Sequence, residues 1–508
     1  ASLGGTPLTI VTMFGDTPRA LAVSPNGNTV YAAVFHSGNK TTTVSEGAVC
    51  NDSNKNDTTV APQCTVGGQN VPGGFPLPTQ DHTGAAAPEV GLIVRHNGTF
   101  WSDLACAGGT KFGWSCTTNA DCPGSTCGRN WNNAVKFNLP DRDVFLIDAT
   151  ANPPVQISGA NGYRTGVGTI LFNMVTNPVS GNVYVSNLEA HNEVRFEGPG
   201  TYAAQFGGST VQGRLGDARI TVISGSSVTP RHLNKHIDYS QRPAPAGVKD
   251  HSLATPLDMV VSSNGSTLYV SAFGSSKVGV FNTAALENDT FTPNNANYIT
   301  VSGGGPGGLV LNETFNRLYV YTRFDNGIAV VDTQTKTEVD HISLYNPEPA
   351  SVVNGRPFLY NAFYTSSNGE AACASCHIFG DLDSLAWDLG NPDDETATNP
   401  ITIKLNIAAG NNTFTNFHPM KGPMATQTLR GMNTHGAMHW RGDRNGGPGQ
   451  VFNEDLAFKA FNPAFVGLVG RTAQLTTAEM QAYTDFILQV TLPPNPIRAL
   501  DNSLTAAQ

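Results

Sequence analysis

Two cysteines and a histidine in the last third of the chain have the spacing of a haem-attachment site. Cys373, Cys376 and His377 form the pattern Cys-x-x-Cys-His. Each thiol in this pattern can add across one vinyl group of a haem, and the adjoining imidazole can bind the iron. With 8 Cys and 12 His in 508 residues, chance would produce the pattern about 0.003 times. We therefore expect one covalently bound haem c with His377 as its proximal ligand.

Two other uses of these residues remain as alternatives. A Cys-x-x-Cys pair can act as a redox dithiol, and it can also form one half of a zinc site. A structural zinc site needs a second ligand pair at similar spacing, and no second Cys pair with that spacing lies nearby in the sequence. The adjoining histidine therefore favours haem.

A sixth ligand to the iron is expected from a thioether or an imidazole within residues 418–439. Methionine opposite histidine raises the reduction potential of a haem, whereas two imidazoles lower it. Met424 is the first candidate and His418 the second. Met420 and Met438 are further candidates, although any of these methionines could instead fill the core.

Other charged or ligand-type residues suggest weaker sites. Arg430, Arg441 and Arg444 could pair with haem propionates, because guanidinium groups match carboxylates in geometry. Five acidic residues crowd the loop after the haem motif and could bind Ca²⁺, although EF-hand spacing is absent and a solvated loop is the alternative. These acidic residues are Asp381, Asp383, Asp393, Asp394 and Glu395.

Three histidines could lie on one face of the first domain. His232, His236 and His251 follow one another closely, and imidazoles are good copper ligands. The alternative is that they are hydrogen-bonded loop residues, which the absence of a nearby Cys or Met favours.

The remaining six cysteines predict export to an oxidising compartment, either the periplasm or the cell exterior. They fall in one Gly/Asn/Thr-rich stretch, which we interpret as a disulfide-stapled insertion over about residues 37–135. Six cysteines allow fifteen pairings, and proximity favours Cys50 with Cys64 and two bridges within the later four. A metal site spanning Cys106 to Cys127 is the alternative. The six are Cys50, Cys64, Cys106, Cys116, Cys122 and Cys127.

Charge and hydropathy exclude several classes of partner. The net charge is −10, and the sequence has no Lys/Arg run or basic stripe, so binding to nucleic acid is not expected. No apolar stretch is long enough to span a bilayer, and the sequence begins like a mature product that has lost a signal peptide. A homo-oligomer remains possible.

A short phrase recurs four times in the first 360 residues: an apolar run, a turn rich in Asn, Gly or Ser, and a second run leading into Tyr. Each copy predicts a β-hairpin. Tyr269 and Tyr319 lie 50 residues apart, and Tyr360 follows 41 residues later, close to the size of one propeller blade. The gaps from Tyr31 to Tyr184 and from Tyr184 to Tyr269, 153 and 85 residues, leave room for further blades. The copies span residues 21–31, 172–184, 259–269 and 309–319.

The fold class predicted from these features is mainly β: a β-propeller of about seven blades over residues 1–360, followed by a mostly α-helical cytochrome c domain over residues 361–508. A pair of β-sandwiches is the alternative for the first domain. Near the end of the second, Thr476 and Glu479 have capping-box spacing and begin an amphipathic helix. We expect this helix to close a haem pocket.

The hairpin repeats resemble those of YVTN-type β-propellers, as in Leu268-Tyr269-Val270 and Leu318-Tyr319-Val320. Residues 418–431 and 438–444 resemble the haem domains of the bacterial dihaem cytochrome c peroxidase and MauG-like group, and this likeness covers about residues 370–500. It departs from that pattern at Gln427, where proline is usual, and by an extra residue between His439 and Asp443. These departures disfavour peroxidase activity, and the lack of a second Cys-x-x-Cys-His motif implies a single haem.

The expected function is that of an exported monohaem c-type cytochrome that carries single electrons between redox partner proteins. The propeller would be a scaffold or a partner-binding surface, because fold alone does not decide function. One alternative is a peroxidase- or oxidase-like haem enzyme with an open sixth position. Another is a surface structural or assembly protein that contains haem.

Overall fold

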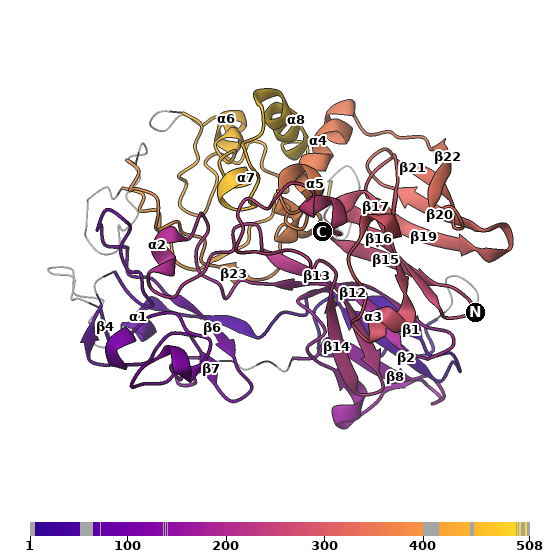
Figure 1. Ribbon diagram of the computed structural model, residues 1–508, viewed down its shortest axis with the longest axis horizontal. Helices are drawn as coiled ribbons and strands as arrows, with labels where there is room; N and C mark the ends of the chain where they lie inside the picture. The colour runs from indigo at the N-terminus through magenta and orange to yellow at the C-terminus, as the bar shows by residue number, and fades with distance from the viewer. Residues whose placement is uncertain are drawn as a thin grey trace.

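The computed structural model describes residues 6–50, 64–71, 73–135, 137, 139, 141–399, 416–447, 452–493, 495, 497–498 and 503–504. The fold of these residues is mainly β. Consecutive sheets lie on the right of Figure 1, an insertion with short strands lies at the lower left, and the C-terminal helices lie above both. No described helix combines the length and the apolar composition needed to cross a bilayer.

Four antiparallel sheets follow one another along the chain. The first contains β1 (Pro18–Val23), β2 (Thr29–Val34), β8 (Val144–Asp148) and β10 (Tyr163–Arg164), with β9 (Val155–Gln156) paired to β8. The second contains β11 (Ile170–Thr176), β12 (Val183–Ala190), β13 (Gly216–Ser224) and β14 (Ser227–His232). The third contains β15 (Pro256–Val261), β16 (Thr267–Ala272), β17 (Lys277–Asn282) and β18 (Tyr298–Thr300). The fourth contains β19 (Pro306–Asn312), β20 (Arg317–Thr322), β21 (Gly327–Asp332) and β22 (Thr337–Ser343).

The four copies of the sequence repeat form the first hairpins of the four sheets. The repeated tyrosine lies on the second strand of each hairpin, opposite an apolar residue of the first strand. The pairs are Ala22 with Tyr31, Val175 with Tyr184, Val260 with Tyr269, and Val310 with Tyr319. The repeat therefore encodes local strand pairing, and the β-sandwich alternative is wrong because each copy begins a separate sheet.

Turn chemistry explains why the first and third copies look alike. In the first, the Ser24 hydroxyl lies 2.8 Å from Asn26 Oδ1 and accepts from the Thr29 amide at 2.9 Å. Ser262 makes the same two contacts with Asn264 and Thr267. Such side-chain to backbone bonds hold a tight turn in place, so these polar residues fix the hairpin register.

The predicted count of about seven blades is wrong for the described part of the chain, which contains four such sheets. The interval from Tyr31 to Tyr184 holds the insertion and the strands β8 to β10 that complete the first sheet. The interval from Tyr184 to Tyr269 holds the rest of the second sheet and a connection over 233–255 without strands. Tyr360 ends a helix. The intervals between the repeated tyrosines therefore overestimated the number of blades, because insertions and connections lengthen the chain without adding sheets.

The four sheets form an open arc in a propeller-like arrangement. Their first strands pack in sequence order, β1 on β11, β11 on β15, and β15 on β19. Ala20 and Ala22 of β1 pack toward the second sheet, whereas Leu21 between them is 65% exposed. On β19, Leu309 packs toward the third sheet, and Val310 is 64% exposed.

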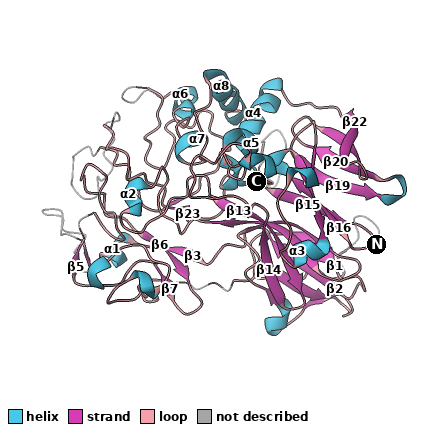
Figure 2. Ribbon diagram, in the orientation of Figure 1, coloured by secondary structure: helices cyan, strands magenta, loops and turns pink. Residues whose placement is uncertain are grey.

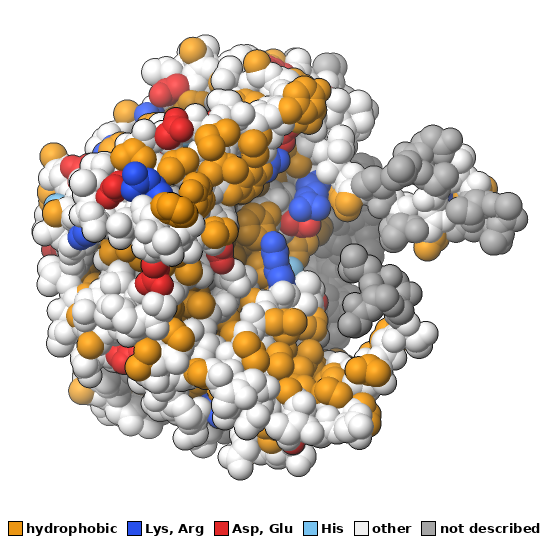
Figure 3. Space-filling model, turned by 90° about the vertical axis from the view of Figure 1, so that its right-hand side faces the viewer, with side chains coloured by type: hydrophobic (Ala, Val, Ile, Leu, Met, Phe, Trp, Pro, Cys, Tyr) orange, Lys and Arg blue, Asp and Glu red, His pale blue; other side chains and the backbone are white. Residues whose placement is uncertain are grey.

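Because alternate residues of a strand face opposite sides, the first and fourth sheets each leave one face uncovered. Figure 3 shows this side of the molecule, where hydrophobic side chains gather above and below a hollow.

The insertion lies between β2 and β8 and carries all three disulfides. It contains β3 (Thr41–Val44), α1 (Glu46–Val49), β4 (Thr65–Val66), β5 (Gln69–Asn70), β6 (Leu92–His96) and β7 (Trp101–Ser102). The bridges are Cys50–Cys64, Cys106–Cys122 and Cys116–Cys127. This agrees with the pairing that proximity favours. The first bridge is buried among Val44, Val94 and Trp101, so the insertion has a small core of its own.

Short helices and long loops make up the C-terminal region. The helices are α4 (Ala350–Tyr360), α5 (Ala362–Thr365), α6 (Glu454–Lys459), α7 (Ala464–Gly467) and α8 (Thr477–Ile487), and a two-stranded ribbon joins β23 (Ala386–Trp387) to β24 (Met424–Ala425). Loop dominates between α5 and α6 in Figure 2. A mostly α-helical domain is therefore not what the described residues show, because many Gly, Pro and Asn residues interrupt the helices.

Helices α4 and α8 pack against each other and join the ends of this region. A Cβ on Gly355 of α4 would lie 2.1 Å from the carbonyl oxygen of Ala482 of α8, so the close packing requires glycine there. Because α4 begins at Ala350, the helical region starts ahead of the boundary placed after residue 360. The capping box is present: Thr476 Oγ1 accepts from the Glu479 amide, and Glu479 Oε2 accepts from the Thr476 amide at 2.8 Å.

The other helical elements are single turns. They are α2 (Thr201–Ala204), α3 (Thr283–Glu287), η1 (Gly109–Lys111), η2 (Asn119–Asp121), η3 (Gly159–Gly162), η4 (Val248–His251), η5 (Phe273–Ser275), η6 (Asn295–Asn297), η7 (Glu313–Phe315), η8 (Cys373–Ser375) and η9 (Ile378–Gly380). Two of them bear on the Cys-x-x-Cys-His motif: η8 contains its first three residues, and η9 follows it directly.

Candidate functional site

The Cys-x-x-Cys-His motif occupies one tight turn at η8. The His377 amide donates to the Cys373 carbonyl at 3.0 Å, and the Ser375 hydroxyl accepts from the Ala372 amide at 3.1 Å. Cys376 is buried and Cys373 half-buried, and both are free thiols, whereas the other six cysteines are in disulfides. The turn therefore holds two unbridged thiols next to an imidazole.

Burial gives these thiols a chemistry unlike that of a redox dithiol. It raises the pKa of the Cys373 thiol to about 11 and raises the pKa of Cys376 well above its usual value. A catalytic dithiol needs a lowered pKa, because the thiolate is the nucleophile. The two thiols also belong to no cluster of three metal-ligand side chains within the described ranges, which counts against zinc.

His377 is held in the form that can bind a metal. Its Nδ1 lies 2.8 Å from the carbonyl oxygen of Gln427, and since a carbonyl only accepts, Nδ1 carries the proton. Nε2 is then the nitrogen with the lone pair, and a hydrogen bond to the other ring nitrogen is how proteins orient a ligating histidine. Burial lowers the pKa of His377, so the neutral ring is favoured.

Apolar side chains from several distant segments surround the motif. The cluster that contains Cys376 also includes Leu385, Trp387, Phe458 and Tyr483. Three residues on one face of the terminal helix α8, Met480, Tyr483 and Ile487, are buried in this cluster, as expected for an amphipathic helix. Residues from α4, α6 and α8 thus surround the motif with apolar side chains that exclude water.

The predicted sixth ligands lie in different places. Met438 is buried in the cluster with Cys376. Met424 is half-buried on β24, directly opposite Trp387 in the ribbon, and is not part of that cluster. His418 and Met420 face the other way, toward the insertion. His418 Nε2 lies 3.1 Å from the Ala85 carbonyl oxygen, and Met420 packs against Ala87, Phe196 and Ala203.

The three arginines suggested for haem propionates already have protein partners. Arg430 lies 3.6 Å from Asp381. Arg441 donates to the His418 carbonyl at 2.8 Å and, together with Arg444, contacts Asp443.

The acidic residues suggested for Ca²⁺ point to separate partners. Asp383 accepts from the Leu385 amide at 2.9 Å and from Trp387 Nε1 at 2.8 Å, while Asp393 accepts from the Tyr202 amide at 2.8 Å. None of the five belongs to a convergent cluster of ligand atoms where the structure describes side chains. The described positions of these five side chains therefore do not support a shared calcium site.

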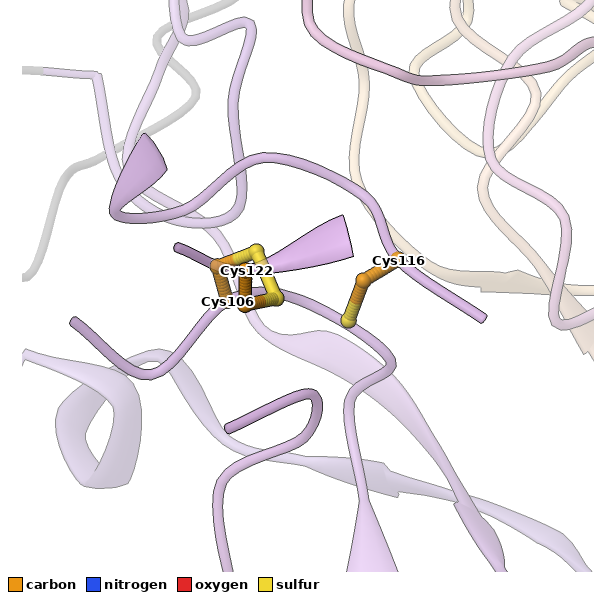
Figure 4. Close-up of side chains that lie close together, drawn as sticks. All are labelled: Cys106, Cys116 and Cys122. Atoms are coloured by element: carbon orange, nitrogen blue, oxygen red, sulfur yellow. A yellow bond between two sulfur atoms is a disulfide. The ribbon is translucent and has the colours of Figure 1, made fainter. Parts of the chain in front are cut away.

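The cysteines of the insertion are structural. Figure 4 shows Cys106 and Cys122 joined by their sulfur atoms, with Cys116 nearby. Cys116 is itself bridged to Cys127. The alternative of a metal site between Cys106 and Cys127 is therefore wrong, because a disulfide sulfur is not a thiolate ligand.

The three histidines suggested for copper do not converge on one point. His236 Nε2 lies 3.0 Å from the Val248 carbonyl oxygen, and His251 Nδ1 accepts from the Asn295 amide at 2.9 Å. His232 instead joins Asp217 and Glu370, with ligand-type atoms within 4.8 Å of one another. The loop-histidine alternative is the better description of His236 and His251.

The cluster of Asp217, His232 and Glu370 links the second sheet to the segment just before the haem motif. Glu370 Oε1 lies 2.8 Å from His232 Nε2 and accepts from the Asn234 side chain at 2.8 Å and the Ala218 amide at 3.0 Å. Its other oxygen accepts from Tyr239. Asp217 accepts both arms of the Arg214 fork, at 3.0 and 3.2 Å. Protein donors thus satisfy these carboxylates, and the cluster is a buried ionic network.

His191 belongs to this network and should make the free energy of unfolding depend on pH. Burial disfavours its charge, but hydrogen bonds to Asp217 and Glu193 outweigh burial and raise the pKa of His191 to about 9. Since this value exceeds the unfolded value near 6.5, the stabilisation is full below about pH 6.5 and is lost as pH rises through about 9. We expect the free energy of unfolding to fall by about 2 to 3 kcal/mol across that window.

Urea unfolding from pH 6 to 9.5 measures this dependence. The His191→Gln variant should show a flatter profile over the same range, with the remaining slope due to Asp143, His232 and His341, whose pKa values are also raised. A profile in the variant as steep as that of the parent would show that His191 does not carry the effect.

No protein-family model matches this chain, and no curated protein matches it significantly. Among solved structures, it is similar to a periplasmic gluconolactonase of Pseudomonas aeruginosa, with 11% identity, a TM-score of 0.31, and coverage of 68% of this chain and 62% of that one. It is also similar to hydrazine synthase of Kuenenia stuttgartiensis, with 14% identity, a TM-score of 0.28, and coverage of 63% and 84%. A third is the β-propeller domain of Cps50 (Swd1) from Myceliophteria thermophila, with 10% identity, a TM-score of 0.22, and coverage of 37% and 44%.

The chain thus spans less than two thirds of the gluconolactonase to which it is similar. All three TM-scores are below 0.5, so the propeller-like arrangement rests on the four sheets themselves. The activities of these proteins are not carried over to this chain.

Proposed function

We propose that this protein is an exported monohaem c-type cytochrome that carries single electrons between redox partner proteins. The observation that supports it most directly is the pair of free thiols at Cys373 and Cys376 beside an imidazole whose Nδ1 is occupied by the Gln427 carbonyl. The other six cysteines are oxidised. Two thiols that remain unbridged at this spacing beside a histidine support covalent attachment of a haem.

The described residues fit a covalently bound haem. Cys373 and Cys376 would form the two thioether bonds, and His377 would bind the iron through Nε2. A bound haem would supply a one-electron couple. The chain orients the proximal ring through Gln427 and excludes water with the apolar cluster around Cys376. The open arc of sheets would be the scaffold or the partner-binding surface.

Export is supported by the three disulfides, because such bridges persist in oxidising compartments. Haem attachment at Cys-x-x-Cys-His would take place in the same compartment. The periplasm or the cell exterior is therefore the proposed location.

The test is the mass and the absorption spectrum of the purified protein. The mass should exceed that of the polypeptide by one haem, and dithionite should produce a reversible change in the Soret and α bands. A mass equal to that of the polypeptide would refute the proposal. Turnover of hydrogen peroxide with a reduced cytochrome donor would instead favour a peroxidase-like enzyme.

A further inference from the structure

We infer that two copies of this chain form a dimer in which their open arcs close into one ring of eight sheets. The partner that covers the exposed faces of the first and fourth sheets is thus a second copy of the chain. The geometry of the four sheets carries this assignment, and it holds whether or not a haem is bound.

Each of the four sheets has two different faces, and the sequence repeat places equivalent residues on the same face every time. We call the face with the repeated tyrosine the tyrosine face, and the opposite one the receiving face. The tyrosine faces of the first three sheets each pack on the receiving face of the next sheet along the chain. The residues that share these clusters are Tyr31 with Met174 and Val183, Tyr184 with Met259 and Leu268, and Tyr269 with Leu309 and Leu318.

The tyrosine face of the fourth sheet is apolar, and no further sheet of this kind follows it in the described part of the chain. Val310 on this face is 64% exposed. Its equivalent in the third sheet, Val260, packs in the cluster between the third and fourth sheets. An apolar face left open in this way marks a binding surface. Six of its side chains form two cross-strand rows: Val310, Tyr319 and Val330, and Tyr321, Ile328 and Ile342.

The receiving face of the first sheet is the matching half. Leu21 stands ten residues before its tyrosine, and the equivalent residues of the other sheets are Met174, Met259 and Leu309. Those three side chains are 6%, 5% and 8% exposed, because the preceding tyrosine face covers them. Leu21 is 65% exposed, and Val23, next on the same face, is 52% exposed, since the described chain has no sheet ahead of the first.

The segment ahead of β1 covers only one end of this receiving face. A Cβ on Gly15 would lie 2.5 Å from Val34 Cγ2, and Val34 is buried. Leu21 and Val23 lie farther along β1 and remain open. The partner therefore reaches these two side chains without displacing the segment.

The two open faces are thus the two halves of one kind of interface. Both lie on the side of the molecule seen in Figure 3, above and below the hollow. A two-fold rotation places the fourth sheet of each copy on the first sheet of the other, so the same contact forms twice and the assembly closes. In each contact β19 would pack on the partner's β1, as β15 packs on β19 within the chain. A ring of eight sheets lies within the range of four to eight blades found in propellers.

Size-exclusion chromatography with light scattering, over a range of protein concentrations, measures the mass of the assembly. We expect the mass of two chains. A single-chain mass at every concentration would overturn the proposal. A mass that keeps rising with concentration would also overturn it, because a contact that does not close produces open polymers.

Val310→Lys changes the tyrosine face and Leu21→Asp changes the receiving face, so each variant should be monomeric. Both side chains are exposed, and each variant should therefore keep the far-ultraviolet circular dichroism spectrum of the parent. The matched control is Val179→Asp, which changes an exposed valine in the turn between β11 and β12 and should leave the dimer intact.

A mixture of the two monomeric variants tests which face meets which. Val310→Lys retains the receiving face and Leu21→Asp retains the tyrosine face, so one native contact can form between them. The second contact then places the introduced lysine near the introduced aspartate. We expect the mixture to have the mass of two chains, although neither variant dimerises alone. A dimer that survives in either variant by itself, or a mixture that stays monomeric, would overturn the pairing of the two faces.

Discussion

The Cys373→Ala/Cys376→Ala double variant should be purified without covalently bound haem. Both thioether bonds need a cysteine sulfur, and the described structure has no other free thiol beside His377. Removal of both sulfurs should therefore abolish covalent attachment, whatever residue provides the sixth ligand. Mass spectrometry after denaturation measures this directly, because a haem held only by coordination dissociates from the unfolded chain.

Two comparisons make that result specific. Each single variant should retain haem through one thioether, with an α band shifted by the remaining vinyl group. His435→Ala, which changes an exposed residue, should retain the full haem content. Covalent haem in the double variant would show that attachment takes place elsewhere on the chain.

The Glu370→Ala variant should be the most destabilised of the substitutions outside the haem motif. The Glu370 side chain is completely buried and accepts from His232, Asn234, Tyr239 and the Ala218 amide. Removal of the carboxylate leaves a buried imidazole and several donors without their acceptor. We expect a loss of about 3 to 5 kcal/mol in the free energy of unfolding, measured by urea denaturation with the disulfides intact.

Two further substitutions provide a scale for that loss of unfolding free energy. Glu370→Gln keeps the shape and one carbonyl acceptor but not the charge, so its effect should be intermediate. Asp340→Ala removes an exposed carboxylate on β22 and should change the free energy of unfolding by less than about 0.5 kcal/mol. A Glu370→Ala variant as stable as Asp340→Ala would show that the network contributes nothing to folding.

Local sequence determined the features whose partners lie within a few residues. The hairpins of the four sheets follow from alternating apolar residues and from turns such as Ser24 to Thr29. The start of α8 follows from Thr476 and Glu479, which bond each other's backbone. The disulfide Cys50–Cys64 joins near neighbours, whereas the sequence left open how the later four cysteines pair. In each case the interaction closes a short loop, which costs little entropy.

Tertiary structure alone decided which distant segments meet. The first sheet is completed by β8, on the far side of the insertion, and the alternation within a strand identifies its buried face but not the strand beside it. The Gln427 carbonyl that orients His377, 50 residues away, is a backbone group that no motif marks. Glu370 and His232 likewise meet across 138 residues.

The motif Cys373-Ala374-Ser375-Cys376-His377 could be identified from the sequence because all of its functional side chains lie within five consecutive residues. The choice of a sixth ligand was not, since the candidates Met424, His418, Met420 and Met438 lie in another segment, and their ranking from sequence carried no information on which way each side chain points. The fold separates two of them: it turns His418 toward the insertion and buries Met438 in the cluster that contains Cys376. Ligand choice depends on the direction of a side chain, which long-range packing sets and local sequence does not.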